Sequence, residues 1–380
     1  MDMRLLVVTP FLETHGGMER VVLKIASHFD ARIHCLRYNP EGTFEEFRGL
    51  DIEVARPGFL SRLPVGRRVS SALEAGSHFY NVRLKDYDLV NAHQTPSEWI
   101  RNRNSPVVWY CHSPNREAFD LYDWRMSQRG PLQKAAFWPS IEAFRIIEAR
   151  TVPKIEYIFT NSKNTQGRIS HYLHRESEVL HPGVELERFS CSDYGKFFLY
   201  PSRIVPEKRI EFALDAFDRF SKSNPDSGWK LVVAGSVSDR PEHRKYFACL
   251  KGMGVANVEF RSNISEEELL GLYSRCGAIL YTPINEDFGI VPLEAFASSK
   301  PCIAVNEGGP KETVEDGVDG FLVNSTDEMA QRMAQLAERP ELLEEMGRRG
   351  RKKAETKFTW KRFLDRFGEK AEELIKEKGK

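Results

Sequence analysis

The sequence has few cysteines, and the six that it contains are scattered along 380 residues. They form no CxxC pair and share no ligand spacing with histidine, so neither a disulfide framework nor a cysteine-based metal site is expected. This pattern favours a reduced, cytoplasmic compartment. Long apolar runs are also missing. The run that begins at Leu5 is too short for a signal peptide or a membrane span, and we interpret it as a first β-strand.

The sequence also lacks an excess of charge of either sign, because 55 basic residues balance 55 acidic ones. A nucleic acid partner is therefore not expected, since proteins that bind nucleic acids usually carry a basic surface. Short-period repeats and low-complexity segments are absent as well. With 41% hydrophobic and 29% charged residues, the composition is that of a globular protein, and the length suggests two domains of ordinary size.

Short apolar runs alternate with helical patterns along the whole chain, which is typical of open, mostly parallel α/β sheets. The pattern is interrupted at residues 182–194, where a linker between domains is predicted. A fresh series of strands and helices follows this linker. We therefore predict two doubly wound, Rossmann-like domains that face each other across a cleft.

The segment 285–296 has the most informative pattern, because it joins an apolar strand at 278–282 to a helix through a loop that contains Gly289. This arrangement aims backbone N–H groups and the positive end of a helix at an anion. Glu294 is near the start of the helix, where a carboxylate interacts favourably with the positive end of the helix dipole. Glu286 lies in the loop, where it would repel a phosphate unless it contacts a neutral group such as sugar hydroxyls.

Two other loops carry features of a phosphate site. Arg203 and Lys208 follow the first strand of the second half, and two cations five residues apart suit a diphosphate, although solvated loop charges explain them equally well. Gly16 and Gly17 stand at the first strand-to-helix junction and allow a ligand to approach the backbone. For a pair of glycines alone, a plain tight turn is the commoner explanation.

Histidine ends two of the predicted strands, at His93 and His112, where ligands bind in parallel sheets. A histidine in this position is more often structural, and His93 fits a structural role and a role on the acceptor side equally well. The sequence from Asp86 to Asp88 looks like the metal-binding Asp-x-Asp of another transferase fold. It leads directly into a strand, so we reject a metal site.

The spacing of Glu286 and Glu294 around the segment 288–290, followed by Glu-Gly-Gly-Pro-Lys-Glu-Thr-Val at 307–314, closely resembles the retaining glycosyltransferases of family four. Enzymes of that family have the GT-B fold, and the resemblance covers nearly the whole chain. It implies a nucleotide-sugar donor, no cofactor and no metal.

The resemblance also implies how the two domains are used. Residues 1–186 form the domain on the acceptor side, and residues 187–356 form the domain that binds the nucleotide sugar. The segment 357–380 is the helix that crosses back to the first domain in GT-B enzymes.

Family positions correspond to individual residues of this chain. The positions implied to act in catalysis are His112, Arg203, Lys208 and Glu286. Those implied to bind the donor are Gly16, Gly17, Gly235, Arg261, Phe288, Gly289, Ile290 and Glu294. We place Arg116, which resembles an arginine of the mannosyltransferase-like branch, on the acceptor side together with His93. An exposed position at a helix start explains Arg116 as well.

The function implied is that of the mannosyltransferase-like branch: metal-independent transfer of a hexose, mannose from GDP-mannose, with retention, to a glycan or lipid-linked acceptor. One alternative is a UDP-hexose donor with a soluble acceptor. A second is a non-catalytic subunit that binds nucleotide sugars, although such subunits usually lose charged site residues. A related epimerase or phosphorylase would lack the loop at 288–290 or carry a cofactor lysine motif.

A basic segment at residues 56–85 contains six lysines and arginines and one acid. Val65, Val69, Leu73 and Phe79 fall near one helical side, so the segment could lie in a membrane interface. An ordinary helix packed on the sheet explains the pattern as well. A lipid-linked acceptor favours peripheral contact with an anionic membrane on its inner face.

Overall fold

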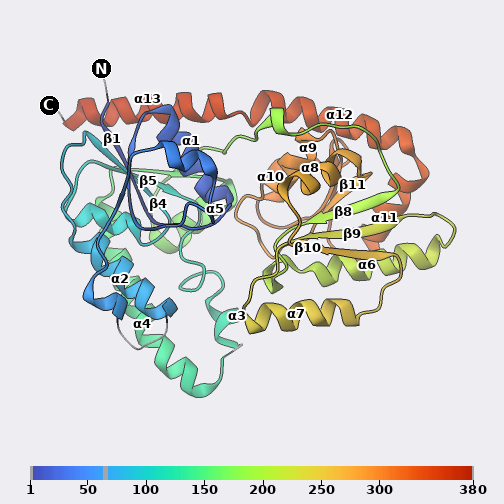
Figure 1. Ribbon diagram of the computed structural model, residues 1–380, viewed down its shortest axis with the longest axis horizontal. Coiled ribbons are helices and arrows are strands. Elements are labelled where there is room, and N and C mark those ends of the chain that lie inside the picture. Colours follow the sequence, from blue (N-terminus) through green and yellow to red (C-terminus); the bar gives the residue numbers. More distant parts are fainter. Residues whose placement is uncertain (1–2, 63–66, 128, 379–380) are drawn as a thin grey trace. The chain divides into compact units, whose positions relative to one another are not determined.

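A computed structural model of the protein describes three stretches of the chain, residues 3–62, 67–127 and 129–378. The chain divides into two units (Figure 1). Unit 1 contains Met1–Pro182 together with Phe363–Lys380, and unit 2 contains Gly183–Arg362. Each unit has its own parallel sheet and its own hydrophobic core, so the predicted α/β architecture of two doubly wound domains is confirmed. The domain boundaries at residues 186 and 356 stay a prediction.

The described residues of unit 1 form a parallel sheet in the order β3-β2-β1-β4-β5-β6-β7. Its strands are β1 (Leu5–Leu12), β2 (Arg32–Tyr38), β3 (Ile52–Val54), β4 (Leu89–His93), β5 (Val107–Cys111), β6 (Tyr157–Thr160) and β7 (Glu178–Val179). β4 and β5 are buried along their whole lengths, as expected for strands covered on both faces. The strand order reverses between β1 and β4, and ligands of open α/β sheets bind at the carboxyl ends of the strands at such a switch point.

Helices cover both faces of this sheet. They are α1 (Gly17–His28), α2 (Arg67–Asn81), α3 (Tyr122–Ser127), α4 (Pro131–Thr151), α5 (Lys163–Arg168) and α13 (Trp360–Lys378), with a short 3₁₀ helix, η3, at Ser97–Asn102. The ring of Phe367 on α13 lies 5.6 Å from that of Phe29 and 6.0 Å from that of Phe159. Arg366 adds two hydrogen bonds of 2.7 Å to Glu178. The last helix therefore packs on unit 1 through apolar and charged contacts.

The apolar residues of the basic segment do not share one side of helix α2, contrary to the prediction. Phe79 is fully buried in the core of unit 1, whereas Val69 and Leu73 are 52% and 45% exposed. The expectation was wrong because residues 73 and 79 are six apart, about 240° around a helix. Val65 and the side chains of Arg62, Arg67 and Arg68 lie outside the described residues. Among the residues that the structure describes, no helix is both long and apolar enough to cross a membrane.

In unit 2, the described residues form a parallel sheet in the order β10-β9-β8-β11-β12-β13. Its strands are β8 (Phe197–Pro201), β9 (Lys230–Gly235), β10 (Val258–Ser262), β11 (Ala278–Tyr281), β12 (Cys302–Val305) and β13 (Gly320–Val323). The chain passes from β8 to β9 on one side and later to β11 on the other. A second switch point therefore lies at the carboxyl ends of β8 and β11.

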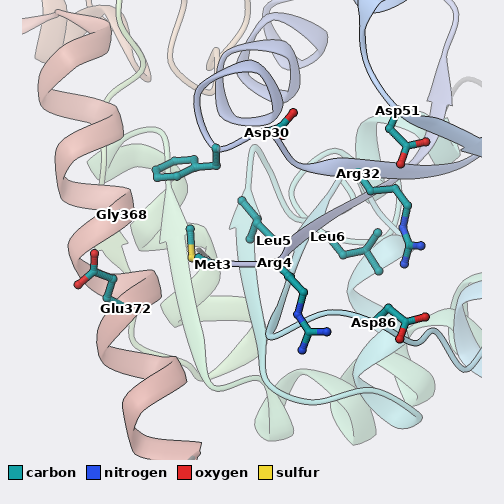
Figure 2. Close-up of a pocket in the computed structure, with 11 residues that line it drawn as sticks. Met3, Arg4, Leu5, Leu6, Asp30, Arg32, Asp51, Asp86, Gly368 and Glu372 are labelled. Carbon is teal, nitrogen blue, oxygen red and sulfur yellow. The ribbon is translucent and has the colours of Figure 1, made fainter. Parts of the chain in front are cut away.

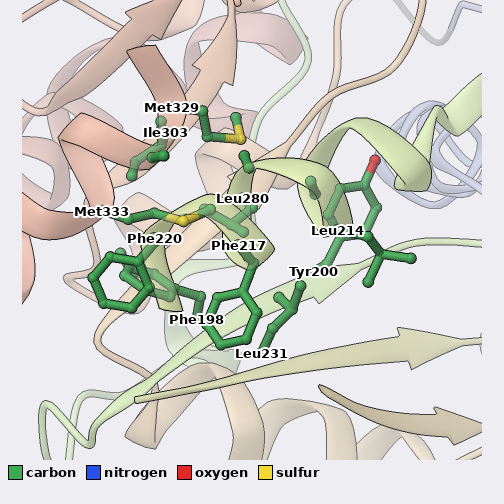
Figure 3. Close-up of a cluster of buried hydrophobic side chains, with 14 of the residues drawn as sticks. Phe198, Tyr200, Leu214, Phe217, Phe220, Leu231, Leu280, Ile303, Met329 and Met333 are labelled. Atoms are coloured by element: carbon green, nitrogen blue, oxygen red, sulfur yellow. The ribbon is translucent and has the colours of Figure 1, made fainter. Parts of the chain in front are cut away.

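The helices of unit 2 bury amphipathic faces on the two sides of this sheet. They are α6 (Ile210–Ser223), α7 (Pro241–Gly252), α8 (Glu266–Arg275), α9 (Val291–Ala297), α10 (Pro310–Thr313), α11 (Thr326–Glu338) and α12 (Pro340–Lys357). Figure 3 shows the core on one side, where Phe217 and Phe220 of α6 meet Phe198 of β8 and Met333 of α11. This packing fixes the position of β8, whose carboxyl end leads into the candidate site.

Candidate active site

In unit 2, the candidate site is built from the loops that follow β8, β11 and β12, which are adjacent strands. Lys208 ends a 3₁₀ turn, η7 (Pro206–Lys208), after β8, and Glu286 lies in the loop after β11. Lys208 Nζ is 2.7 Å from Glu286 Oε2. The two side chains are 16% and 22% exposed, so both charged groups remain accessible to a ligand while they contact each other.

Backbone hydrogen bonds hold Lys208 in this place. Its carbonyl oxygen accepts hydrogen bonds from the hydroxyl groups of Tyr200 and Thr282, both of which are buried. The next residue, Arg209, has φ of 53°, a left-handed conformation that non-glycine residues adopt only when their surroundings enforce it. The single hydrogen of the Thr282 hydroxyl is shared with the Arg209 carbonyl oxygen, which lies 2.9 Å from the hydroxyl oxygen. The ammonium group of Lys208 is thus carried by a closely constrained turn.

Arg209 and Glu307 form a second charged pair at this edge of the sheet, and neither was among the predicted site residues. The Arg209 guanidinium donates to Glu307 Oε1 at 2.9 Å and to the Thr282 carbonyl at 3.0 Å. The other oxygen of Glu307 accepts the backbone N–H of Asn285 at 3.2 Å. This network joins all three loops. The Glu-Gly-Gly motif at 307–309 was the available signal for Glu307, but its partner depends on the strand order.

The backbone of the loop that carries Glu286 is in direct contact with the backbone of residues 308–309. The N–H of Gly309 donates to the Glu286 carbonyl at 2.9 Å. A Cβ at Gly309 would lie 2.2 Å from the Phe288 carbonyl oxygen, so no larger residue fits there. Gly289 has φ of 79° and lies against the ring of Tyr281. Phe288 itself is buried in the core of unit 2.

Glu294 lies in the first turn of α9, which begins at Val291. Its Oε2 accepts a hydrogen bond of 2.6 Å from the hydroxyl of Tyr273, which is buried. Burial, and then the neighbouring Glu294 carboxylate, raise the pKa of Tyr273 well above its ordinary value. The phenol therefore stays protonated and fixes one oxygen of Glu294 as an acceptor.

Three further predicted residues of unit 2 are the catalytic candidate Arg203 and the donor-binding candidates Gly235 and Arg261. Arg203 is exposed, and its side chain has no hydrogen-bond or ion-pair partner among the described residues. Gly235 ends β9, where a Cβ would lie 1.7 Å from the Ser202 carbonyl oxygen, so close packing alone explains this glycine. Arg261 on β10 pairs with Glu259 at 2.7 Å on the surface. The predicted roles of these residues stay predictions.

In unit 1, the predicted residues His93 and His112 are in direct contact at the carboxyl ends of β4 and β5. His93 Nδ1 is 3.1 Å from His112 Nε2, and His93 Nε2 is 2.6 Å from Asn91 Oδ1. His93 is fully buried, whereas His112 is partly exposed. Burial lowers the pKa of His112 to about 3 and that of His93 well below its ordinary value. Both rings are therefore neutral at physiological pH.

Arg116 lies four residues after His112 and pairs with the largely buried carboxylate of Asp120. Its guanidinium is 2.9 Å from Asp120 Oδ2, and the guanidinium of Arg168 is 3.3 Å from the same oxygen. Arg168 also donates to the Ser113 hydroxyl at 3.2 Å. Two guanidinium groups thus contact one carboxylate close to His112.

Gly16 and Gly17 lie where the sequence placed them, at the junction of β1 and α1. Gly16 is the N-cap of the helix, and Gly17 is its first residue. The chain leaves β1 at the carboxyl edge of the sheet, on which His93 and His112 also lie. Their contact with a donor stays a prediction.

A cavity of about 550 Å³ in unit 1 lies elsewhere (Figure 2). It is lined at the amino end of β1 by charged groups of both signs, including Arg4, Arg32, Asp86 and Glu372. This edge is opposite to the one that carries the histidines, and none of the predicted site residues lines the cavity. Within the described residues, no cluster of three histidine, cysteine or acidic side chains is arranged to hold a metal ion.

Comparisons with known proteins cover both halves of the chain. The sequence model described as "Glycosyltransferase Family 4" matches residues 15–188, and the one described as "Glycosyl transferases group 1" matches residues 188–353. The Alpha-1,3/1,6-mannosyltransferase ALG2 of Mus musculus is 28% identical, and the alignment covers 95% of this chain and 94% of that protein. The ALG2 protein of Dictyostelium discoideum is 27% identical, with 92% and 93% covered.

Solved structures resemble the whole chain in fold. The sucrose-phosphate synthase from Thermosynechococcus elongatus has a TM-score of 0.77 at 17% identity, with 98% of this chain and 99% of that chain covered. HepE from Anabaena, solved in complex with UDP-glucose, has a TM-score of 0.73 at 18% identity, with 98% and 100% covered. At these identities the likeness concerns the fold alone.

Proposed function

The chain belongs to glycosyltransferase family 4 and has the GT-B fold, and we propose that it transfers mannose from GDP-mannose to a glycan or lipid-linked acceptor with retention. The ALG2 relatives are mannosyltransferases by name, which supports mannose as the sugar. The observation that carries the proposal is the contact of 2.7 Å between Lys208 and Glu286 at a switch point of the sheet. It provides a cation for phosphate and an acceptor for sugar hydroxyls within one site.

The reaction requires positive charge where the nucleoside diphosphate departs. As the bond between the anomeric carbon and the diphosphate oxygen breaks, negative charge grows on that oxygen, and Lys208 is placed to stabilise it. The exposed guanidinium of Arg203 lies in the same loop and would add a second cation. In the free protein, Glu286 neutralises Lys208, so the lysine is held in position before the donor arrives.

Retention follows, in this proposal, from attack on the face of the leaving group. The acceptor hydroxyl oxygen forms the new bond to the anomeric carbon, and its proton passes to the departing diphosphate oxygen. Glu286 binds hydroxyls of the transferred sugar. Glu294 binds the ribose hydroxyls, with one of its oxygens already held by Tyr273.

A panel of radiolabelled nucleotide sugars tests the proposal. We expect the purified protein to hydrolyse GDP-mannose faster than UDP-hexoses in the absence of acceptor, and the mass of the product with acceptor to increase by one hexose. A variant with both Lys208→Ala and Glu286→Ala serves as the blank. Preference for a UDP-hexose would identify a different donor, and binding of donors without turnover of any would identify a non-catalytic subunit.

Activity is expected to persist in EDTA, because Lys208 and Arg203 supply the positive charge that a metal ion provides in other transferases. Initial rates with GDP-mannose before and after exhaustive chelation measure this. The control adds Mg²⁺ or Mn²⁺ back to the treated protein. Loss of activity that either ion restores would contradict metal-independent transfer.

We also propose peripheral contact with an anionic membrane through the start of α2 and the preceding turn. Phe59 is 77% exposed and precedes the exposed Val69 and Leu73 of α2. A basic residue near an anionic surface contributes about 1 kcal/mol, so binding should be reversible and weakened by salt. Flotation with anionic and neutral liposomes at low and high salt measures it. Equal flotation of the Arg62/Arg67/Arg68→Ala variant and the wild type would show that this segment does not bind the membrane.

A further inference from the structure

Buried polar groups of β4 form a chain of hydrogen bonds that begins at a backbone carbonyl of β5 and ends at His112, at the carboxyl edge of the sheet. Asn91 and His93 are two residues apart on β4, so their side chains lie on the same face. His93 pairs in register with Tyr110 of β5, and His112 follows two residues later. The order of contacts is therefore Val108, Asn91, His93 and His112.

Asn91 sets the direction of this chain. Its Nδ2 donates to the carbonyl oxygen of Val108 at 3.2 Å, inside the sheet. A flipped amide would place two acceptors against each other in a buried position, which is unfavourable. The Oδ1 atom of Asn91 therefore faces His93 Nε2 at 2.6 Å, and His93 Nε2 must carry the proton.

The remaining protons follow from this assignment. A neutral His93 with its proton on Nε2 has a lone pair on Nδ1, which lies 3.1 Å from His112 Nε2. His112 Nε2 must then be the donor. In the neutral ring of His112, Nδ1 keeps its lone pair, and it has no hydrogen-bond partner among the described residues.

We propose that His93 is a positioning residue which, anchored by Asn91, holds His112 in the tautomer whose Nδ1 is a hydrogen-bond acceptor. An acceptor nitrogen binds a hydroxyl group and repels a phosphate oxygen. If the proposed transfer is correct, on which this consequence rests, His112 therefore contacts a hydroxyl of the sugar rather than the diphosphate. His93 takes no part in the reaction except through His112.

The tautomers can be measured without any substrate. In protein labelled with ¹⁵N-histidine, at neutral pH, we expect both rings to show a protonated Nε2 and an unprotonated Nδ1. A scalar coupling across the N–H···N bond between His93 and His112 is also expected. Single substitutions of each histidine assign the signals. Detection of the Nδ1-protonated form of His112, or of a mixture of both forms, would overturn the proposal.

Two substitutions at His93 separate hydrogen bonding from packing. His93→Gln keeps a donor for Asn91 and an acceptor for His112, whereas His93→Leu has a similar volume and keeps neither. We expect His93→Leu to lower kcat about tenfold, as loss of one hydrogen bond does, and His93→Gln to recover most of this loss. Thermal unfolding of both variants checks that they are folded.

Failure of this proposal and failure of the proposed function give different results. If no donor is turned over but the NMR signals show the predicted tautomers and coupling, the positioning role stands and the function does not. If GDP-mannose is turned over and folded His93→Leu is as active as the wild type, the positioning role is wrong.

Discussion

Replacement of Lys208 by alanine is expected to lower kcat about 10²–10³-fold, the loss seen when one preorganised group that stabilises charge in a transition state is removed. Hydrogen bonds from Tyr200 and Thr282 fix the turn that carries Lys208. In the proposed reaction, its charge should interact with the departing diphosphate more strongly than with the bound donor. The loss should therefore appear mainly in kcat rather than in KM.

Steady-state kinetics with GDP-mannose measure this loss, and Lys222→Ala on α6 is the matched control. Lys222 is also paired with a carboxylate, Asp218 at 2.6 Å, but it is exposed and far from the predicted residues in sequence. Lys208→Arg should recover part of the activity, since it restores the charge without the point-like ammonium. A kcat for Lys208→Ala within twofold of the wild type would show that the diphosphate binds elsewhere.

The fold could be predicted from the sequence because its signals are local. The apolar run at 278–282 contains the observed strand β11, Ala278–Tyr281, and the run that begins at Leu5 is the first strand, β1. Periodicity identifies such elements because each buries its own face. The same reasoning failed for α2, where the predicted apolar side combined the buried Phe79 with the exposed Leu73.

The contacts within the site could be predicted only in part. The sequence places Lys208, Glu286, His93 and His112 at or after the ends of strands, and the catalytic roles of Lys208, Glu286 and His112 are implied by the family resemblance. Their pairing was not predicted, because it depends on which strands are neighbours in the sheet. The direction of the hydrogen-bond chain required Asn91, which is an ordinary strand residue in the sequence. The backbone geometry could not be predicted from the sequence either. Arg209 has a left-handed conformation that is enforced by groups more than seventy residues away, such as the Thr282 hydroxyl.

The partners of Glu286 and Glu294 suggest why these two carboxylates should have different tasks. Glu286 contacts a cation directly, whereas Glu294 accepts a hydrogen bond from a neutral phenol. Glu294→Ala should therefore weaken donor binding with a smaller effect on kcat. In the proposed reaction, Glu286 binds the sugar, whose charge changes during transfer, so its loss should have the larger effect on turnover.

Glu286→Ala is expected to lower kcat by about 10²-fold, because hydrogen bonds to a charged group contribute about 1.5–3 kcal/mol each. The carboxylate should bind the sugar hydroxyls more tightly as the ring gains positive charge, so the effect should fall on kcat. Glu286→Gln keeps the shape and loses the charge. It therefore separates hydrogen bonding from electrostatic stabilisation, and we expect it to recover only a small part of the activity.

The control for Glu286 is Glu345→Ala on α12, which removes an exposed carboxylate paired with Arg349. Donor affinity measured by calorimetry, next to kcat, separates binding from turnover. If Glu286→Ala weakens donor binding but turns over at the rate of the wild type, its contact with the sugar is the same in the ground state and in the transition state. Glu286 would then be a binding group, and the stabilisation of the developing positive charge would have to come from another residue.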